Sequence, residues 1–96
     1  MTTVITLLTR PDCALCAHAK RVLDRVGAEH PLRVDEVNLD SSHGQQLAAR
    51  SGVMFAPGIL LDGQPYAFGR LSEKALRRDL SRRAQTTEPV TTPEEK

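Results

Sequence analysis

The chain has 96 residues and a formal net charge of +1, with two cysteines, two phenylalanines, one tyrosine and no tryptophan. This length allows one small domain, whose core must be built mainly from Val, Leu, Ile and Ala. The near-neutral charge argues against nucleic acid as a partner, and no apolar run approaches the ~20 residues that span a bilayer. Because no basic and apolar leader follows Met1, we expect a soluble cytoplasmic protein that binds no membrane.

The first segment of the chain predicts a strand followed by a helix. Residues 4–9 are mostly β-branched residues and leucines, which is typical of a buried strand. Apolar residues then recur at helical spacing over residues 13–26. We expect Asp12 to be the N-cap of this helix and Gly27 to stop it.

The next segment predicts a second strand and a second helix. Residues 32–39 form the strand, but the alternation of apolar residues slips between Val34 and Val37. This slip predicts an irregularity or a strand that is buried on both faces. A short helix should follow over residues 43–50 and stop at Gly52.

The third segment predicts a β-hairpin. Residues 59–61 and 66–68 are apolar, and Asp62-Gly63 between them is a favoured two-residue turn because both turn positions need positive φ. Pro65 lacks a backbone N–H, so the last strand either lies at a sheet edge or only starts at this residue.

The final segment predicts a third helix over residues 73–83, capped by Ser72. Leu71 and Leu76 are spaced as a hydrophobic staple at its start. Thr, Pro and Glu dominate residues 85–96, so we expect a domain over residues 1–84 and a disordered C-terminal tail. The order βαβαββα predicts an α/β fold with a four-stranded mixed sheet flanked by three helices.

The chemistry of the sequence is concentrated at Cys13 and Cys16, which directly follow the first predicted strand and open the first helix. Binding sites in open α/β sheets lie beyond the carboxyl ends of the strands. A helix N-terminus offers unpaired N–H groups and about half a positive charge, and both favour a thiolate. The pattern therefore predicts a reactive pair in which Cys13 is the nucleophile and Cys16 attacks the resulting mixed disulfide. Arg10 can add positive charge near Cys13.

Three other interpretations of the pair remain open. A structural disulfide is one, although a loop this short constrains almost nothing. A zinc site formed with His18 and His43 is another, and two inert core cysteines are the third. We expect no metal site, because no second C-x-x-C or H-x₃₋₅-H pattern is present.

Cys13-Ala14-Leu15-Cys16, Ala56-Pro57 and the Asp62-Gly63 hairpin followed by Gly69-Arg70-Leu71-Ser72 together resemble the thioredoxin superfamily, and most closely small bacterial glutaredoxin-like proteins. The resemblance covers roughly residues 4–83 and implies a thioredoxin-like fold. In that family the proline matching Pro57 is cis and faces the redox pair, while the backbone beside it holds an extended peptide or glutathione. The segment matching Gly69–Glu73 lies along the same groove. The resemblance thus implies that Ala56, Pro57, Gly69, Arg70 and Ser72 bind substrate, and we add Arg10 to these residues for its positive charge near Cys13.

The resemblance implies a thiol–disulfide oxidoreductase with no bound cofactor. Its partners would be a protein that carries a disulfide and a reductant, which is either glutathione or a flavoprotein reductase. The pair departs from the family by enclosing Ala-Leu, and a single Gly69 is followed by Arg70. These departures motivate an alternative, a thioredoxin-fold module that binds peptides without redox turnover.

Overall fold

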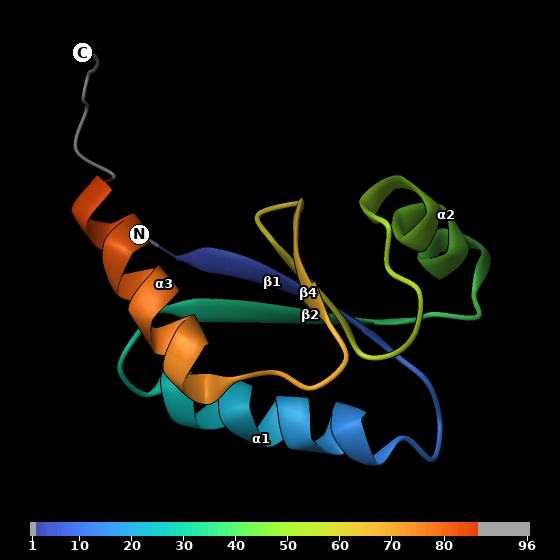
Figure 1. Cartoon of the computed structure of the whole chain (residues 1–96), viewed down its shortest axis with the longest axis horizontal. Coiled ribbons are helices and arrows are strands. Elements are labelled where there is room, and N and C mark those ends of the chain that lie inside the picture. Colours follow the sequence, from blue (N-terminus) through green and yellow to red (C-terminus); the bar gives the residue numbers. More distant parts are fainter. Residues whose placement is uncertain (1, 87–96) are drawn as a thin grey trace.

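The computed structural model describes residues 2–86, with side chains as far as Arg83, and has the predicted order of elements (Figure 1). The strands are β1 (Thr3–Thr9), β2 (Leu32–Asn38), β3 (Gly58–Leu61) and β4 (Gln64–Phe68). The helices are α1 (Ala14–Gly27), α2 (Ser42–Ser51) and α3 (Glu73–Thr86). The predicted α/β class, with one four-stranded mixed sheet and three helices, is confirmed.

The sheet has the strand order β2-β1-β3-β4. β1 and β2 are parallel, whereas the β1–β3 and β3–β4 pairs are antiparallel. β1 and β2 run in register from Thr3 opposite Leu32 to Thr9 opposite Asn38, so their carboxyl ends lie side by side. The loop that leaves β1 and the loop that leaves β2 therefore start next to each other, at the edge of the sheet where α1 begins.

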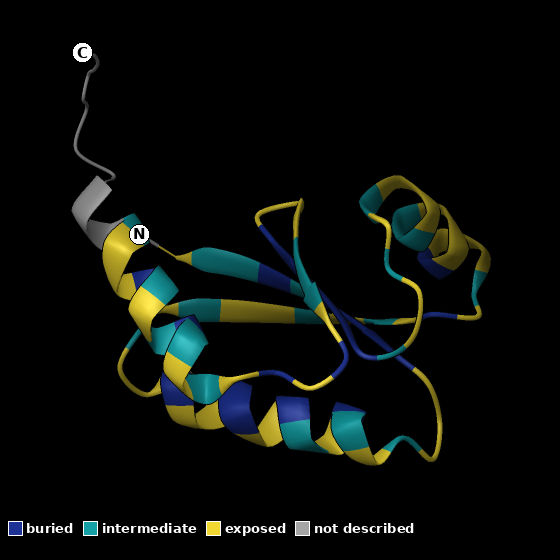
Figure 2. Cartoon of the chain, viewed as in Figure 1, coloured by how far each residue is buried: buried dark blue, intermediate teal, exposed yellow. Residues whose placement is uncertain are grey.

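The main core lies between the sheet and the two helices α1 and α3, which occupy the same side of it (Figures 1 and 2). Ile5 and Leu7 of β1 pair with Leu61 and Ile59 of β3 and present the aliphatic face of the sheet. The remaining buried members of the core are Ala19, Val22, Leu23, Val26, Leu71, Leu76 and Leu80. The core is thus almost wholly aliphatic, as the composition predicts.

Two expectations about β2 are wrong. Its pairing with β1 shows no irregularity, and the strand is not buried on both faces, because Val34 is 44% exposed and the charged residues are half-buried or exposed. The physical reason is its place at the sheet edge, where only β1 pairs with it. Polar and charged residues suit such an edge because they discourage pairing with another chain.

The ends of two helices also differ from the prediction. The N-cap of α1 is Cys13 rather than Asp12, because Asp12 has a φ of 55° and completes the turn that leaves β1. α3 is capped by Ser72 as predicted and runs to Thr86, three residues past its expected end. The helix therefore includes the first two residues of the expected tail, and residues 87–96 lie outside the described part of the chain.

The hairpin follows the prediction at its turn and at its edge. Asp62 and Gly63 have φ values of 48° and 82°, and β4, which contains Pro65, is the edge strand. A register shift between Ile59 and Leu60 lets the strand accommodate the proline. Among the described residues, none of the helices is both long and apolar enough to cross a membrane.

Candidate functional site

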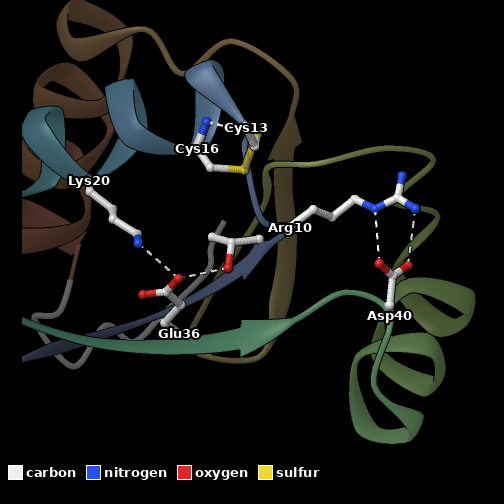
Figure 3. The surroundings of a disulfide bond; sticks show 7 residues. Arg10, Cys13, Cys16, Lys20, Glu36 and Asp40 are labelled. Atoms are coloured by element: carbon white, nitrogen blue, oxygen red, sulfur yellow. Dashed lines mark hydrogen bonds and ion pairs between the residues drawn. A yellow bond between two sulfur atoms is a disulfide. The ribbon is translucent and has the colours of Figure 1, made fainter.

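Cys13 and Cys16 lie at the start of α1, just after the loop that follows β1, at the carboxyl ends of the parallel strands (Figure 3). A disulfide joins them, and their Cα atoms are 5.2 Å apart. Cys13 is half-buried at the helix cap, whereas Cys16 is only 3% exposed. The pair therefore has one sulfur accessible to a partner and one held inside, one helical turn further along.

The start of α1 provides an electropositive setting for Cys13. Its Sγ accepts a hydrogen bond of 3.1 Å from the backbone N–H of Cys16. The first turn of the helix contains no acidic residue that would oppose the helix dipole. Once the disulfide is reduced, the same N–H remains available to a thiolate on Cys13, and this favours the nucleophilic form.

A hollow of about 680 Å³ opens beneath the disulfide, between α1 and the ends of β1 and β2. Inside it Nζ of Lys20 lies 2.9 Å from a carboxylate oxygen of Glu36, to which the hydroxyl of Thr9 donates a 2.8 Å hydrogen bond (Figure 3). The hydrogen bonds from Lys20 and then Thr9 hold the pKa of Glu36 below its ordinary value. Lys20 is exposed at the surface and has this carboxylate as its partner beside the redox pair.

A second hollow, of about 450 Å³, lies on the other side of Cys13. Arg10 and Asp40 meet in it through two contacts of 3.2 Å each, one from Nε and one from a terminal guanidinium nitrogen (Figure 3). Phe55 and Ala56 also line this hollow. The predicted substrate residues Arg10 and Ala56 thus lie in one hollow with Cys13.

Pro57 follows Ala56 through a cis peptide bond and is fully buried. Its carbonyl oxygen accepts a 2.8 Å hydrogen bond from the N–H of Gly69, which ties the predicted residue Gly69 to the same loop. Gly69 has a φ of 85°, and a Cβ placed there would lie 3.1 Å from the ring of Phe55. A glycine at this position therefore lets Phe55 lie against the backbone.

Arg70 and Ser72 are placed apart from Cys13. Both line a hollow on the α3 side of the domain, together with Tyr66 and Asp79. The hydroxyl of Ser72 accepts from the N–H of Ala75, so this side chain serves the cap of α3. Of the predicted site residues, those from Arg10 to Gly69 form one connected region and these two do not line it.

The zinc interpretation finds no support in the described part of the chain. Within residues 2–86, no three His, Cys, Asp or Glu side chains gather in an arrangement that could hold a metal ion. His18 and His43, which were considered as partners of the two cysteines, form no such cluster with them.

Sequence reasoning missed three residues that surround the pair, namely Glu36, Asp40 and Phe55. A signal was present for each of them. Parallel strands end side by side, so the residues at the end of β2 and just after it must approach those at the end of β1. Glu36 and Asp40 occupy these places. The signal for Phe55 was its position directly before Ala56-Pro57, which the resemblance places beside the redox pair.

Comparison with known proteins gives a family and a fold. The family model of the Glutaredoxin-like domain (DUF836) matches residues 4–81. A thioredoxin from Methanocaldococcus jannaschii is 33% identical over 72 residues, which cover 75% of this chain and 85% of that protein.

Two solved structures are similar in fold at low sequence identity. A thioredoxin variant from Halobacterium salinarum has a TM-score of 0.65 and 21% identity, covering 95% of this chain and 78% of the other. A structure described as that of a malarial protein has a TM-score of 0.61 and 19% identity, covering 86% and 97% respectively. These likenesses show a thioredoxin-like fold.

Proposed function

The chain belongs to the glutaredoxin-like domain family, and on that basis we propose that it is a thiol–disulfide oxidoreductase. The observation that carries the proposal is the disulfide between an accessible Cys13 and a buried Cys16 in the first turn of α1. A purely structural disulfide is a poor explanation, because closing so short a loop removes little entropy from the unfolded chain. Disulfides of this kind in the cytosol are usually transient and catalytic, and we propose the cytoplasm as the location.

The reaction begins with the reduced pair. The Cys13 thiolate attacks one sulfur of a substrate disulfide, the substrate S–S bond breaks, and the first substrate thiolate leaves and takes up a proton. The Cys16 thiol then loses its proton and attacks Sγ of Cys13 in the mixed disulfide. This second exchange forms the Cys13–Cys16 disulfide and releases the second substrate thiol. The substrate gains two electrons and two protons, and the protein is oxidised by the same amount.

We propose a disulfide-bearing protein as the substrate. Its extended backbone would lie beside Ala56 and Pro57, next to Cys13, and continue toward Gly69, with Arg70 and Ser72 as more distant contacts. A reductant must return the pair to the dithiol state, either glutathione or a flavoprotein reductase. No bound cofactor is part of this chemistry.

Single serine substitutions test the mechanism. Cys13→Ser should abolish reduction of a protein disulfide such as that of insulin, because no thiolate remains at the helix cap. Cys16→Ser should instead accumulate a mixed disulfide between Cys13 and the substrate, seen as a mass increase that a reductant removes. Circular dichroism of both variants checks that the fold is retained. Full activity of the Cys13→Ser protein would sink the proposal.

A second candidate, a peptide-binding module without turnover, is favoured by one observation. Met54, Phe55 and Phe68 are 80%, 52% and 41% exposed, although apolar side chains of this size usually contribute to a core. In this alternative a partner protein binds the wild type and the double Cys→Ser variant equally well. Capture of a partner only by the Cys16→Ser variant, through a covalent bond, excludes it.

A further inference from the structure

We propose that Asp40 is a specificity-determining residue that directs the site away from anionic disulfides, glutathione disulfide among them, and toward neutral or cationic ones. The inference rests on the proposed oxidoreductase function and names the substrate class of that same site. It starts from an ion pair that lines the same hollow as Cys13.

The ion pair removes the cation that an anionic substrate would use. Arg10 lies three residues before Cys13, and an isolated guanidinium there would attract a carboxylate. Asp40 instead contacts Arg10 twice, because Nε and one terminal nitrogen of the guanidinium each lie 3.2 Å from a carboxylate oxygen (Figure 3). These two nitrogens are therefore already paired with a carboxylate. The two side chains are 53% and 52% exposed, so an approaching substrate meets them as a neutralised pair.

The other charged residues around Cys13 do not restore a positive field. Lys20, the other lysine or arginine that lines the two hollows beside the disulfide, is paired with Glu36 at 2.9 Å. Asp12 is exposed directly before Cys13, and among the described residues no cation pairs with its carboxylate. The two hollows are lined by two cations and three carboxylates, which leaves one net negative charge at the approach to the sulfur.

The fold itself brings Asp40 to Arg10. β1 and β2 end side by side, with Thr9 opposite Asn38. Arg10 and Asp40 therefore follow neighbouring strand ends, and the parallel register brings them together. A glutathione molecule carries two carboxylates and one ammonium group, and is therefore a net anion at neutral pH. It would have to displace Asp40 from Arg10 or bind without the guanidinium.

The expected effect is modest because the groups are exposed to water. Interactions between exposed charges change rates by about two- to fivefold and weaken as salt is added. A rate ratio between differently charged disulfides is the appropriate readout. A change in the reactivity of Cys13 itself alters the attack on every disulfide alike, so it cancels in such a ratio.

The test uses three small symmetric disulfides that differ in charge: cystamine (cationic), 2-hydroxyethyl disulfide (neutral) and 3,3′-dithiodipropionate (anionic). The fully reduced protein is mixed with each, quenched in acid and alkylated, and formation of the Cys13–Cys16 disulfide is followed by mass spectrometry. The reduced protein is itself the two-electron donor, so no other reductant is needed. Wild type is compared with Asp40→Asn and with Asp35→Asn as the matched control.

Asp35 suits the control because it also pairs with an arginine, Arg33, at 3.2 Å. It lies opposite Thr6 in the register, on the sheet face away from α1, so its substitution changes the net charge equally but not at the site. We expect wild type to react more slowly with the anionic than with the neutral disulfide. Asp40→Asn should raise the anionic-to-neutral ratio about two- to fivefold, and Asp35→Asn should leave it unchanged.

Two outcomes separate this inference from the proposed function. Reaction of wild type with the neutral disulfide, combined with an anionic-to-neutral ratio that Asp40→Asn does not raise, overturns the role of Asp40 and leaves the oxidoreductase in place. No reaction with any of the three disulfides overturns both. Equal increases of the anionic-to-neutral ratio in Asp40→Asn and Asp35→Asn would show a general effect of net charge and would likewise overturn the role of Asp40.

Discussion

The backbone N–H of Cys16 donates a hydrogen bond to Sγ of Cys13 across 3.1 Å, so the first cysteine caps the helix that carries the second. In the reduced protein this N–H and the positive end of α1 stabilise a thiolate on Cys13. We therefore expect its alkylation rate to be half-maximal at a pH below about 8.5, the value for free cysteine. Alkylation of the reduced protein over a pH series, with the site located by mass spectrometry, measures this.

Cys16 provides the internal control for that experiment. It is 3% exposed, so the reagent should modify it much more slowly than Cys13 in the same samples at every pH. If Cys13 instead titrates at or above the free value, or the two cysteines react alike, the helix start does not activate the site. The peptide-binding module would then be the better proposal.

Glu36 should make the stability of the domain depend on pH. Lys20 and Thr9 hold its pKa below the ordinary value in the folded protein. A carboxyl whose folded pKa is depressed adds stability above its unfolded pKa, about 4.3, and that stability is lost as the pH falls through the folded pKa. Glu36→Gln should thus be less stable than wild type near neutral pH, by at most about 0.5 kcal/mol because the pair is half exposed.

Urea unfolding of both proteins between about pH 7 and about pH 2 checks the expectation. The difference in the free energy of unfolding between wild type and Glu36→Gln should disappear at the acidic end of this range. Lys20→Gln should also weaken the pH dependence of the free energy of unfolding, because Lys20 is the largest cause of the lowered pKa of Glu36. A difference in the free energy of unfolding that stays constant or grows toward low pH contradicts a stabilising role for the lowered pKa of Glu36.

The fold was predictable wherever one local pattern decides the structure. The run of residues 4–9 forms β1, and Asp62-Gly63 forms the turn because its two positions take positive φ. The cysteines lie at a helix start because an apolar helical pattern begins directly after a strand. None of these inferences requires knowing which strands are neighbours.

The burial of β2 and the ion pairs around the site depended on how the strands and helices pack together, which no single segment of the sequence reveals. The pattern of β2 suggested burial on both faces, yet the strand lies at the sheet edge. The parallel register of β1 and β2 brings Arg10 and Asp40 together, whereas Lys20 of α1 meets Glu36 of β2 because the helix packs on the sheet. The charges around Cys13 could be counted from the sequence, and parallel strand ends indicated that Glu36 and Asp40 approach the site, but the ion pairs that they form were not predicted.

Gly44 should be the least replaceable glycine of the described chain. A Cβ there would lie 2.1 Å from the carbonyl oxygen of Asn38, and a backbone atom cannot move aside as a flexible side chain can. We expect Gly44→Ala to destabilise the domain by about 3 kcal/mol and to speed hydrogen exchange in α2. Gly63→Ala is the control, because its added Cβ meets nothing within 4 Å and only the φ of 82° is strained. It should cost about 1–2 kcal/mol and leave α2 protected.

Phe55 should contribute to recognition of a protein substrate rather than to stability. Its ring lines the hollow beside Cys13 and meets Phe68 edge-on, with the ring centroids 5.0 Å apart. Both rings are largely exposed, so they form an apolar surface next to the reactive sulfur that loses contact with water only when a partner covers it. We expect Phe55→Ser to lower kcat/KM about fivefold for a peptide disulfide that carries leucine beside its cysteine.

The same variant should react normally with 2-hydroxyethyl disulfide, which is too small to cover the phenylalanine rings. Val34→Ser is the matched control, because Val34 is a 44% exposed apolar residue on β2 and lines neither hollow beside the disulfide. It should change neither rate. An equal loss with the peptide and the small disulfide would place the effect on the reactivity of Cys13, whereas a loss confined to the peptide means that Phe55 contacts the substrate.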